Sequence, residues 1–357
     1  MLARAEPSPK PVDGALWFAG RVDKPQEHKT WISSLDFKGK IDVLTCGSAN
    51  DRFLSQIAFA RMCFDALGGV YRDARFVACL AEYEKPELPA GWAPYFENIE
   101  VVWANPEGLP NPGFNLQHEK RFEVMREDAD IAIFCDADVC ILRPFEDILN
   151  KLVRGQMIAG VMAHYHLPID GVRGDADADW SRIATAVLGH DIDRPYRYLF
   201  GSDPKQPLVT APEQRPRAPF YLNYGVVMGP PAQLRRMLEM EIALHPAVAG
   251  VVGEYWAAQV GLALACIKLD IPRRTLPPRF NYANRPEADV LYPEELGKIV
   301  FFHYMFDRNF SRKTLFNQPA AFEAFVNTRQ TGADERLRQH IVRITGGRYP
   351  FSGAVPV

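Results

Sequence analysis

Several features that define particular protein classes are missing from this sequence of 357 residues. The 41 Lys and Arg residues face 44 Asp and Glu residues, a net charge of −3, so there is no basic field to hold nucleic acid. No apolar run reaches the roughly 18 to 20 residues that a bilayer span requires. Pro7, Pro9 and Pro11 interrupt the start of the chain before any apolar segment of signal-peptide length. We therefore expect a cytoplasmic protein with no nucleic-acid partner and no membrane span.

Cysteine is scarce and is not arranged in pairs. The six cysteines show no C-x-x-C spacing, and most lie inside apolar runs. This pattern favours reduced thiols in a hydrophobic core over a disulfide framework or a structural zinc site. The cysteines are Cys46, Cys63, Cys79, Cys135, Cys140 and Cys266.

What the sequence does contain is a regular alternation of strand-length apolar runs and helical patterns. This alternation predicts an α/β fold with a mostly parallel, mixed sheet flanked by helices. The predicted strands are 41–46, 75–80, 99–103, 131–135, 157–162, 220–228 and 299–302, and the predicted helices are 53–67, 117–126, 231–244, 254–269 and 322–345.

The same patterns predict how the chain is organised. A Pro-rich, irregular N-terminal arm covers residues 1–38, the main domain covers 39–312, and a helical C-terminal extension covers 313–357. Within the main domain, residues 164–218 are polar and are predicted to form one long loop. Because a loop of that length in a compact domain is usually functional or disordered, we assign this insertion to the acceptor side of a binding site.

The strongest local motif is the apolar strand 131–135, which runs directly into Asp136 and Asp138. Two carboxylates two residues apart at the C-terminal edge of a parallel sheet can converge on one hard cation, such as Mn²⁺ or Mg²⁺. The alternative is a turn in which each Asp accepts hydrogen bonds from nearby backbone.

Four segments, in order, resemble the nucleotide-sugar glycosyltransferases of the GT-A (Rossmann-like) fold, and most closely their retaining family 8. They are IDVLTCGSANDRFLSQIAFARMCFDAL from Ile41, FCDADVCIL from Phe134, YLNYGVVM from Tyr221, and IVFFHY from Ile299. The resemblance covers about residues 41 to 310. It implies a metal-dependent transfer of a sugar, with a UDP-sugar as the expected donor, to a hydroxyl of a carbohydrate or other acceptor, with retention of configuration. A homo-oligomer is left open.

The resemblance also implies roles for individual residues. The family's acidic position near the nucleotide falls on Asn50 or Asp51, with Phe53 as the aromatic that follows. Asn223 and Glu254 are the catalytic candidates beside the reacting sugar, and His303 is expected to complete a metal site with Asp136 and Asp138. The candidate donor-binding residues are Thr45, Cys46, Gly47, Asp51, Lys120, Arg121, Asp136, Ala137, Asn223, Gly225 and Arg308.

Purely structural interpretations stand beside several of these roles. His303 follows four apolar residues, as a buried core histidine would, and Asn223 and Gly225 are also typical of a bend in a strand. Glu254 is also a favourable first-turn acid of a helix. Lys120 and Arg121 are adjacent on a predicted helix, so at most one of them is expected to face a phosphate.

The sequence departs from the family where a Gly and a diphosphate-binding Lys usually follow the metal-binding histidine. Here Phe306 and Asn309 occupy those positions. A cation for the diphosphate must then come from Arg308, Arg312 or Lys313, or be absent. The departure keeps a nucleotide-sugar-binding pseudoenzyme as an alternative function.

Two further hypotheses concern the segment 164–218. Its aromatics, Trp180, Tyr196, Tyr198 and Phe200, either stack on sugar faces or pack the loop, and His164 and His166 form an H-x-H that lacks a nearby third metal ligand. A haloacid-dehalogenase-like phosphatase, whose nucleophile motif is also a D-x-D, would need a later acid pair after a strand. The acids Asp175, Asp177 and Asp179 follow a polar loop instead.

Overall fold

The computed structural model describes residues 36–81, 86–104, 119–169 and 171–354. By its contacts the chain divides into Met1–Ile32 and Ser33–Val357. The predicted N-terminal arm therefore lies almost wholly outside the described residues, and the second unit holds the described helices and strands.

A seven-stranded mixed sheet forms the centre of this unit, with the strand order β10-β6-β9-β4-β1-β2-β3. Four neighbouring strands are parallel, whereas β9 runs antiparallel to both β4 and β6. The predicted α/β class and mostly parallel, mixed sheet are confirmed. The strands are β1 (Ile41–Ser48), β2 (Arg75–Ala81), β3 (Glu100–Ala104), β4 (Ile131–Cys135), β6 (Ile158–Met162), β9 (Leu222–Gly229) and β10 (Arg273–Thr275).

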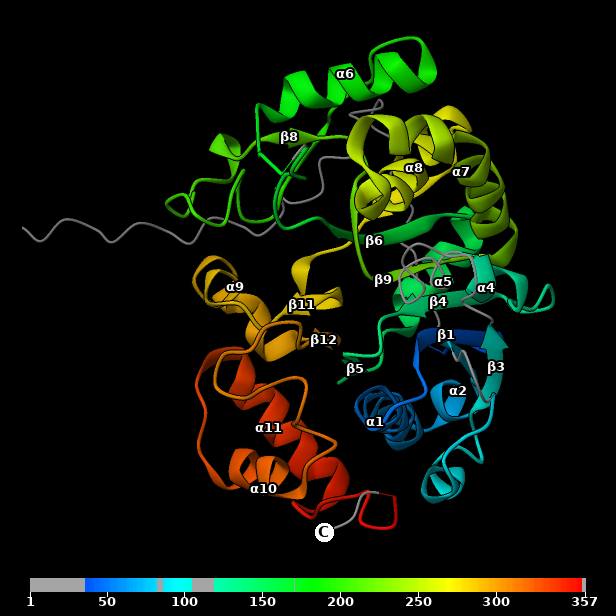
Figure 1. Cartoon of the computed structure of the whole chain (residues 1–357), viewed down its shortest axis with the longest axis vertical. Coiled ribbons are helices and arrows are strands. Elements are labelled where there is room, and N and C mark those ends of the chain that lie inside the picture. The colour runs from blue at the N-terminus through cyan, green and yellow to red at the C-terminus, as the bar shows by residue number, and fades with distance from the viewer. Residues whose placement is uncertain (1–35, 82–85, 105–118, 170, 355–357) are drawn as a thin grey trace, which may run out of the picture. The chain divides into compact units, whose positions relative to one another are not determined.

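Both faces of this sheet are covered, which explains why its strands are apolar throughout. Successive residues of β1 point to opposite faces, so Val43 joins one hydrophobic cluster and Leu44 the other. Helices α1 (Asp51–Leu67) and α2 (Gly69–Arg72) pack into the first cluster, and α7 (Pro231–Val252) and α8 (Glu254–Lys268) into the second (Figure 1). All six cysteines are free and buried, as predicted.

A small second sheet continues from the main one. Strand β5 (Val139–Ile141) follows β4 after a turn at residues 136–138, and it pairs antiparallel with β12 (Phe301–His303). Strand β11 (Tyr282–Ala283) pairs on the other side of β12. The register places His303 opposite Val139, so the end of β12 lies directly beside the turn that carries Asp136 and Asp138.

The prediction of one long loop over 164–218 is wrong. This segment contains helix α6 (Ala176–Leu188) and the short strands β7 (Tyr196–Arg197) and β8 (Arg217–Ala218), which pair with each other. Asp175 caps α6 by accepting hydrogen bonds from the amides of residues 177 and 178. The buried face of α6 is spaced as a helix requires, at Ala176, Trp180, Ile183 and Ala184, but polar flanks obscure the pattern.

Other boundaries differ by smaller amounts. Helix α7 continues through Pro246 to Val252 instead of ending near 244, and the predicted C-terminal helix is two helices, α10 (Pro319–Asn327) and α11 (Gly332–Thr345). Across the described part of the chain, no helix is both long and apolar enough to cross a bilayer. The remaining helices are α4 (Glu119–Glu123), α5 (Glu146–Gly155), α9 (Pro286–Leu291) and the 3₁₀ turns η1 (Ala90–Tyr95), η2 (Pro212–Gln214), η3 (Pro278–Phe280) and η4 (Pro293–Lys298).

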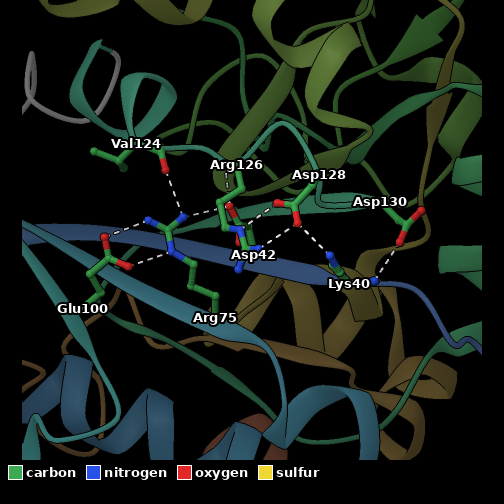
Figure 2. Close-up of polar contacts among 8 residues, drawn as sticks. All are labelled: Lys40, Asp42, Arg75, Glu100, Val124, Arg126, Asp128 and Asp130. Carbon is green, nitrogen blue, oxygen red and sulfur yellow. Dashed lines mark hydrogen bonds and ion pairs between the residues drawn. The ribbon is translucent and has the colours of Figure 1, made fainter.

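A charge network ties the strand starts together at the N-terminal edge of the sheet (Figure 2). Arg75 at the start of β2 forms a two-point ion pair with Glu100 at the start of β3, at 2.7 and 2.8 Å, and also contacts the buried Asp42 of β1 at 3.0 Å. Hydrogen bonding to Arg75 lowers the pKa of Glu100. The Lys40 ammonium group pairs with Asp128 at 2.6 Å, and the Lys40 backbone amide donates to Asp130, the residue before β4, at 2.8 Å. Ion pairs thus fix this edge, whereas the opposite, C-terminal edge carries the D-x-D turn.

Candidate metal and anion site

Asp136, Asp138 and His303 meet at the junction of the two sheets. His303 Nε2 lies 3.2 Å from Asp138 Oδ1 and 3.8 Å from Asp136 Oδ2. One ligand atom from each residue lies within 4.8 Å of the other two. The structure thus brings together the three residues that the sequence predicts as metal ligands.

Gly225 on β9 makes this approach sterically feasible. A Cβ at this position would lie 2.2 Å from His303 Nδ1 and 2.4 Å from its Cε1, so only glycine leaves room for the ring. The carbonyl of Gly225 also accepts a hydrogen bond from the amide of Asp136 at 3.1 Å. Gly225 therefore positions Asp136 through its carbonyl group, and it leaves room for the His303 ring because it has no side chain.

A relay of two asparagines sets the orientation of the His303 ring. The amide of Gly225 donates to Asn223 Oδ1 at 2.9 Å, and Asn281 Nδ2 donates to the same oxygen at 2.8 Å. Asn281 Oδ1 therefore faces His303 and accepts from Nδ1–H at 3.0 Å. With the proton on Nδ1, the Nε2 lone pair of a neutral ring points at the two carboxylates. Asn281 is buried, and no motif in the sequence singles it out.

The electrostatics of the cluster call for a cation. Burial raises the pKa of Asp136, and its Oδ1 is buried with no hydrogen-bond partner. Burial alone would lower the pKa of His303, but the carboxylates of Asp138 and Asp136 outweigh it and raise the pKa. Carboxylate oxygens and a neutral imidazole are ligands that Mn²⁺ accepts, and the unpartnered Asp136 Oδ1 is a donor atom free to bind a cation. The residues present therefore fit a divalent metal ion.

Two arginines lie beside the cluster. Arg312 Nη1 contacts Asp138 Oδ2 at 3.0 Å. Arg52, in the first turn of α1, has no side-chain hydrogen-bond partner among the described residues, and its Nε is buried. Burial, followed by the nearby Arg312 charge, lowers the pKa of Arg52. Two neighbouring guanidinium groups, one of them in the first turn of α1, could together hold an anion such as a diphosphate. Arg312 was among the predicted cations, whereas Arg52 was missed.

The residues predicted to hold the nucleotide cluster around the end of β1. Thr45 is buried with its Oγ1 unpartnered, Cys46 is buried, and Gly47 packs directly against the ring of Phe53. Burial raises the pKa of the Cys46 thiol to about 12, so it stays protonated. These positions adjoin the turn after β4, because β1 and β4 are parallel neighbours.

Both candidates for the family's acidic position already have hydrogen-bond partners. Asn50 caps α1 by accepting from the amide of Phe53 at 3.2 Å. Asp51 Oδ1 accepts from the indole of Trp92 at 2.8 Å. Both residues have a structural task at the start of α1.

Lys120 and Arg121 point in different directions, as expected for neighbours on a helix. Lys120 pairs with Glu123 at 2.6 Å on the surface. Arg121 is buried with its guanidinium carbon 5.3 Å from the centroid of the Phe134 ring. The positive charge of Arg121 acts to lower the pKa of Asp136, but burial, which raises that pKa, has the larger effect.

Two other predicted residues have partners away from the cluster of Asp136, Asp138 and His303. Arg308 pairs with Asp289 at 2.7 Å, whereas Arg312 is the cation that contacts Asp138. Glu254 contacts His245 on α7 at 3.2 Å and has no contact with the cluster. Ala137 lies buried in the turn between the two aspartates, with its carbonyl near the hydroxyl of Tyr304.

The aromatics of residues 164–218 are mainly core. Trp180, Tyr198 and Phe200 are buried, and the indole of Trp180 donates to Tyr198 Oη at 2.7 Å. His166 is also buried, between Tyr198 and Asp179, and takes no part in an H-x-H metal site. Tyr196 packs against Phe220 and is half-buried.

Comparison with solved structures finds glycosyltransferases. The galactosyltransferase LgtC, solved in complex with donor and acceptor sugar analogs, has a TM-score of 0.47 and 13% identity over 85% of this chain and 96% of that one. The bifunctional glycosyltransferase WbbM has a TM-score of 0.42 and 8% identity over 88% of this chain and 52% of that one. Mouse xyloside xylosyltransferase 1 has a TM-score of 0.43 and 9% identity, over 74% of this chain and 98% of that one.

No protein-family model matches the sequence, and a search of curated proteins finds no match. The functional conclusion therefore depends on the residues of the site.

Proposed function

We propose that this chain is a metal-dependent glycosyltransferase of GT-A type that moves a sugar from a nucleotide sugar, most simply a UDP-sugar, to an acceptor hydroxyl with retention of configuration. The observation that carries the proposal is the convergence of Asp136, Asp138 and His303 at the C-terminal edge of the main sheet. Open α/β sheets bind their ligands at this edge.

Arg52 and Arg312 support a diphosphate as the anion at this site. They would stand in for the lysine that the family carries where this chain has Asn309. Both arginines lie near Asp138. A diphosphate bound at the cluster of Asp136, Asp138 and His303 would therefore be close enough for its negative charge to pair with both guanidinium groups. A bound Mn²⁺ or Mg²⁺ would stabilise the negative charge that develops on the leaving diphosphate.

The proposed reaction breaks the bond between the anomeric carbon and the diphosphate oxygen, and the bonding electron pair leaves with the diphosphate. A bond forms from the acceptor oxygen to the same carbon, and the proton of the acceptor hydroxyl passes to the departing diphosphate oxygen, which becomes basic as its bond to carbon breaks. In this step Arg52 and Arg312 hold the leaving group, and Asn223 offers its Nδ2, which has no partner among the described residues, to the donor sugar. The role predicted for Glu254 stays a prediction.

Two alternatives from the sequence lose support in the structure. The pseudoenzyme hypothesis rested on the missing glycine and lysine after His303, and the two arginines beside Asp138 offer the cation that the missing lysine would have supplied. The phosphatase hypothesis needs a second acid pair at the site, but Asp175 caps α6, Asp177 pairs with Arg194, and Asp179 bonds to His166.

The proposal is tested by a thermal-shift screen with UDP, GDP, CDP and ADP in the presence of Mn²⁺, followed by assays for nucleoside diphosphate released from the matching nucleotide sugar. We expect one diphosphate to raise Tm only when Mn²⁺ is present, because stabilisation grows with ligand concentration over Kd. Asp138→Asn should abolish this shift and the release of diphosphate.

Asp270→Asn is the matched control, because the Asp270 side chain is 98% exposed and follows α8, away from the cluster. It should respond to Mn²⁺ and diphosphate as the unmodified protein does. A folded protein that no diphosphate stabilises, with or without Mn²⁺, would contradict the proposed function.

A further inference from the structure

Helix α11 of the C-terminal extension carries a buried carboxylate that contacts residues on both sides of the metal-ligand candidate His303. Asp334 lies in the first turn of α11 and is 0% exposed. Its Oδ2 accepts from Asn309 Nδ2 at 2.7 Å, and its Oδ1 accepts from Asn284 Nδ2 at 3.4 Å. Burial raises the pKa of Asp334, because a carboxylate that is removed from water loses free energy. Aspartate is rarely buried completely unless its partners need it.

The two asparagines connect Asp334 to the segment 306–312. Asn284 is itself buried, and it accepts from the Phe306 amide at 2.9 Å and donates to the Phe306 carbonyl at 2.8 Å. Asn309 stands at the position where the family usually has its lysine, but its side chain bonds to Asp334. Asp334 therefore fixes this segment at its start and in its middle.

The backbone of Arg312, at the end of the same segment, is held on both sides. Its amide donates to Asp307 Oδ1 at 2.8 Å, and its carbonyl accepts from Gln56 Nε2 at 3.1 Å. Gln56 follows Arg52 by four residues on α1, so the two side chains lie on one face of that helix. The Arg312 side chain starts from this fixed backbone and reaches Asp138 Oδ2 at 3.0 Å.

Helix α11 is a firm support for these contacts because its second half is anchored elsewhere. His340 Nε2 lies 3.2 Å from Cys63 Sγ of α1, and Arg343 Nη2 donates to the carbonyl of Leu142 at 3.2 Å. Leu142 directly follows β5, the strand that begins after Asp138. The same helix thus contacts α1, the end of β5 and the segment 306–312.

We propose that Asp334 is a positioning residue for the diphosphate: through Asn309 and Asn284 it holds the segment 306–312 so that the Arg312 guanidinium stays beside Asp138. The inference rests on the proposed glycosyltransferase function. A charged group that is held in place before binding loses less conformational freedom when the ligand arrives, so the ligand binds more tightly. The negative charge of Asp334 would by itself weaken the binding of an anion. Its favourable contribution is therefore geometric.

The test is a double-mutant cycle on the full chain, with binding of UDP, GDP, CDP and ADP in the presence of Mn²⁺ measured by calorimetry. We expect Asn309→Ala and Asp334→Ala each to weaken the tightest-binding diphosphate by about threefold to tenfold. In the Arg312→Met background each should weaken it by less than about twofold, because residues that act through one partner are not additive. Loss of a purely electrostatic effect of Asp334 would instead strengthen binding.

Glu335→Ala is the matched control on the same helix. The Glu335 carboxylate bonds to the Gln330 amide and to Arg338, so its removal should lower stability and leave the affinity for diphosphate unchanged. If Asp334→Ala does not fold, Asn309→Ala decides the question, because Asn309 is exposed and its loss breaks the same hydrogen bond.

Unchanged diphosphate affinity in Asn309→Ala overturns the inference. So does a loss that adds fully to that of Arg312→Met, because Asn309 would then bind the diphosphate itself. If no diphosphate binds to the unmodified protein, the proposed function fails, and Mn²⁺ affinity without nucleotide tests the positioning role separately. Asn309→Ala should then strengthen Mn²⁺ binding as Arg312→Met does, because Arg312 is released from Asp138, and an unchanged Mn²⁺ affinity would overturn the inference.

Discussion

Replacing Gly225 with alanine tests the geometry of the metal cluster most directly. The new Cβ would lie 2.2 Å from His303 Nδ1, whereas ordinary contact begins near 3.4 Å, so the ring must retreat by 3.4 − 2.2 = 1.2 Å. Metal–ligand distances tolerate only about 0.2 Å of error. The displaced ring would also lose its hydrogen bond to Asn281. We expect Gly225→Ala to weaken Mn²⁺ binding by at least about tenfold and to lower the free energy of unfolding by about 1–3 kcal/mol.

Electron paramagnetic resonance of free Mn²⁺ gives the affinity, and urea unfolding gives the stability. Gly160→Ala is the matched control, because its Cβ would crowd Leu222 Cδ1 at 2.7 Å and touch no predicted metal ligand. This control should lose stability to a similar degree and keep its Mn²⁺ affinity. If Gly225→Ala binds Mn²⁺ within twofold of the unmodified protein, the reasoning about the cluster is refuted.

Three further predictions concern the neighbours of the cluster and the C-terminal helices. Asn281→Leu removes the acceptor for His303 Nδ1–H and should weaken Mn²⁺ binding about 10- to 100-fold in the same resonance assay; an unchanged affinity would show that the relay is dispensable. Arg312→Met should strengthen Mn²⁺ binding without nucleotide, because a competing cation leaves Asp138, but should weaken binding of nucleoside diphosphate at least about tenfold by calorimetry, whereas Lys313→Met changes neither. Burial, followed by the Arg343 charge, lowers the pKa of His340 to about 3, so the unfolded chain takes up a proton between about pH 6.5 and 3 that the folded chain does not. Stability should therefore fall as the pH is lowered through this window, by up to about 1.4 kcal/mol per unit, and urea titrations of His340→Gln should show a shallower slope; an identical slope would exclude His340 as a source.

Local sequence was informative where structure depends on near neighbours. The apolar run 131–135 predicts a buried strand, because only a strand covered on both faces is apolar at every position. The same run predicts that Asp136 and Asp138 lie at the end of that strand. The sequence also contained a signal for helix α6, because Trp180 and Ile183 lie on one helical face. The polar residues around them favoured the prediction of a loop instead.

The relay and the arginine pair could not be predicted from the sequence, because their geometry depends on pairings between distant residues. Asn281 meets His303 only because β11 pairs with β12, and β11, a strand of two residues, carries no periodic signal. Arg52 looks like any charged residue in the first turn of a helix. Its approach to Arg312, 260 positions further along the chain, is a property of the tertiary fold.

The junction between the two sheets has a consequence for how this protein could be re-engineered. Residues 281–312 alone carry Asn281, Arg285, His303, Phe306 and Arg312, while β1, β4 and β9 supply the opposite wall. Exchange of this single stretch in a chimera would therefore replace His303, its asparagine support and Arg312 together. A designer who wishes to change this wall and keep the three predicted metal ligands must retain His303 and Asn281 and vary only the residues around Arg285 and Phe306.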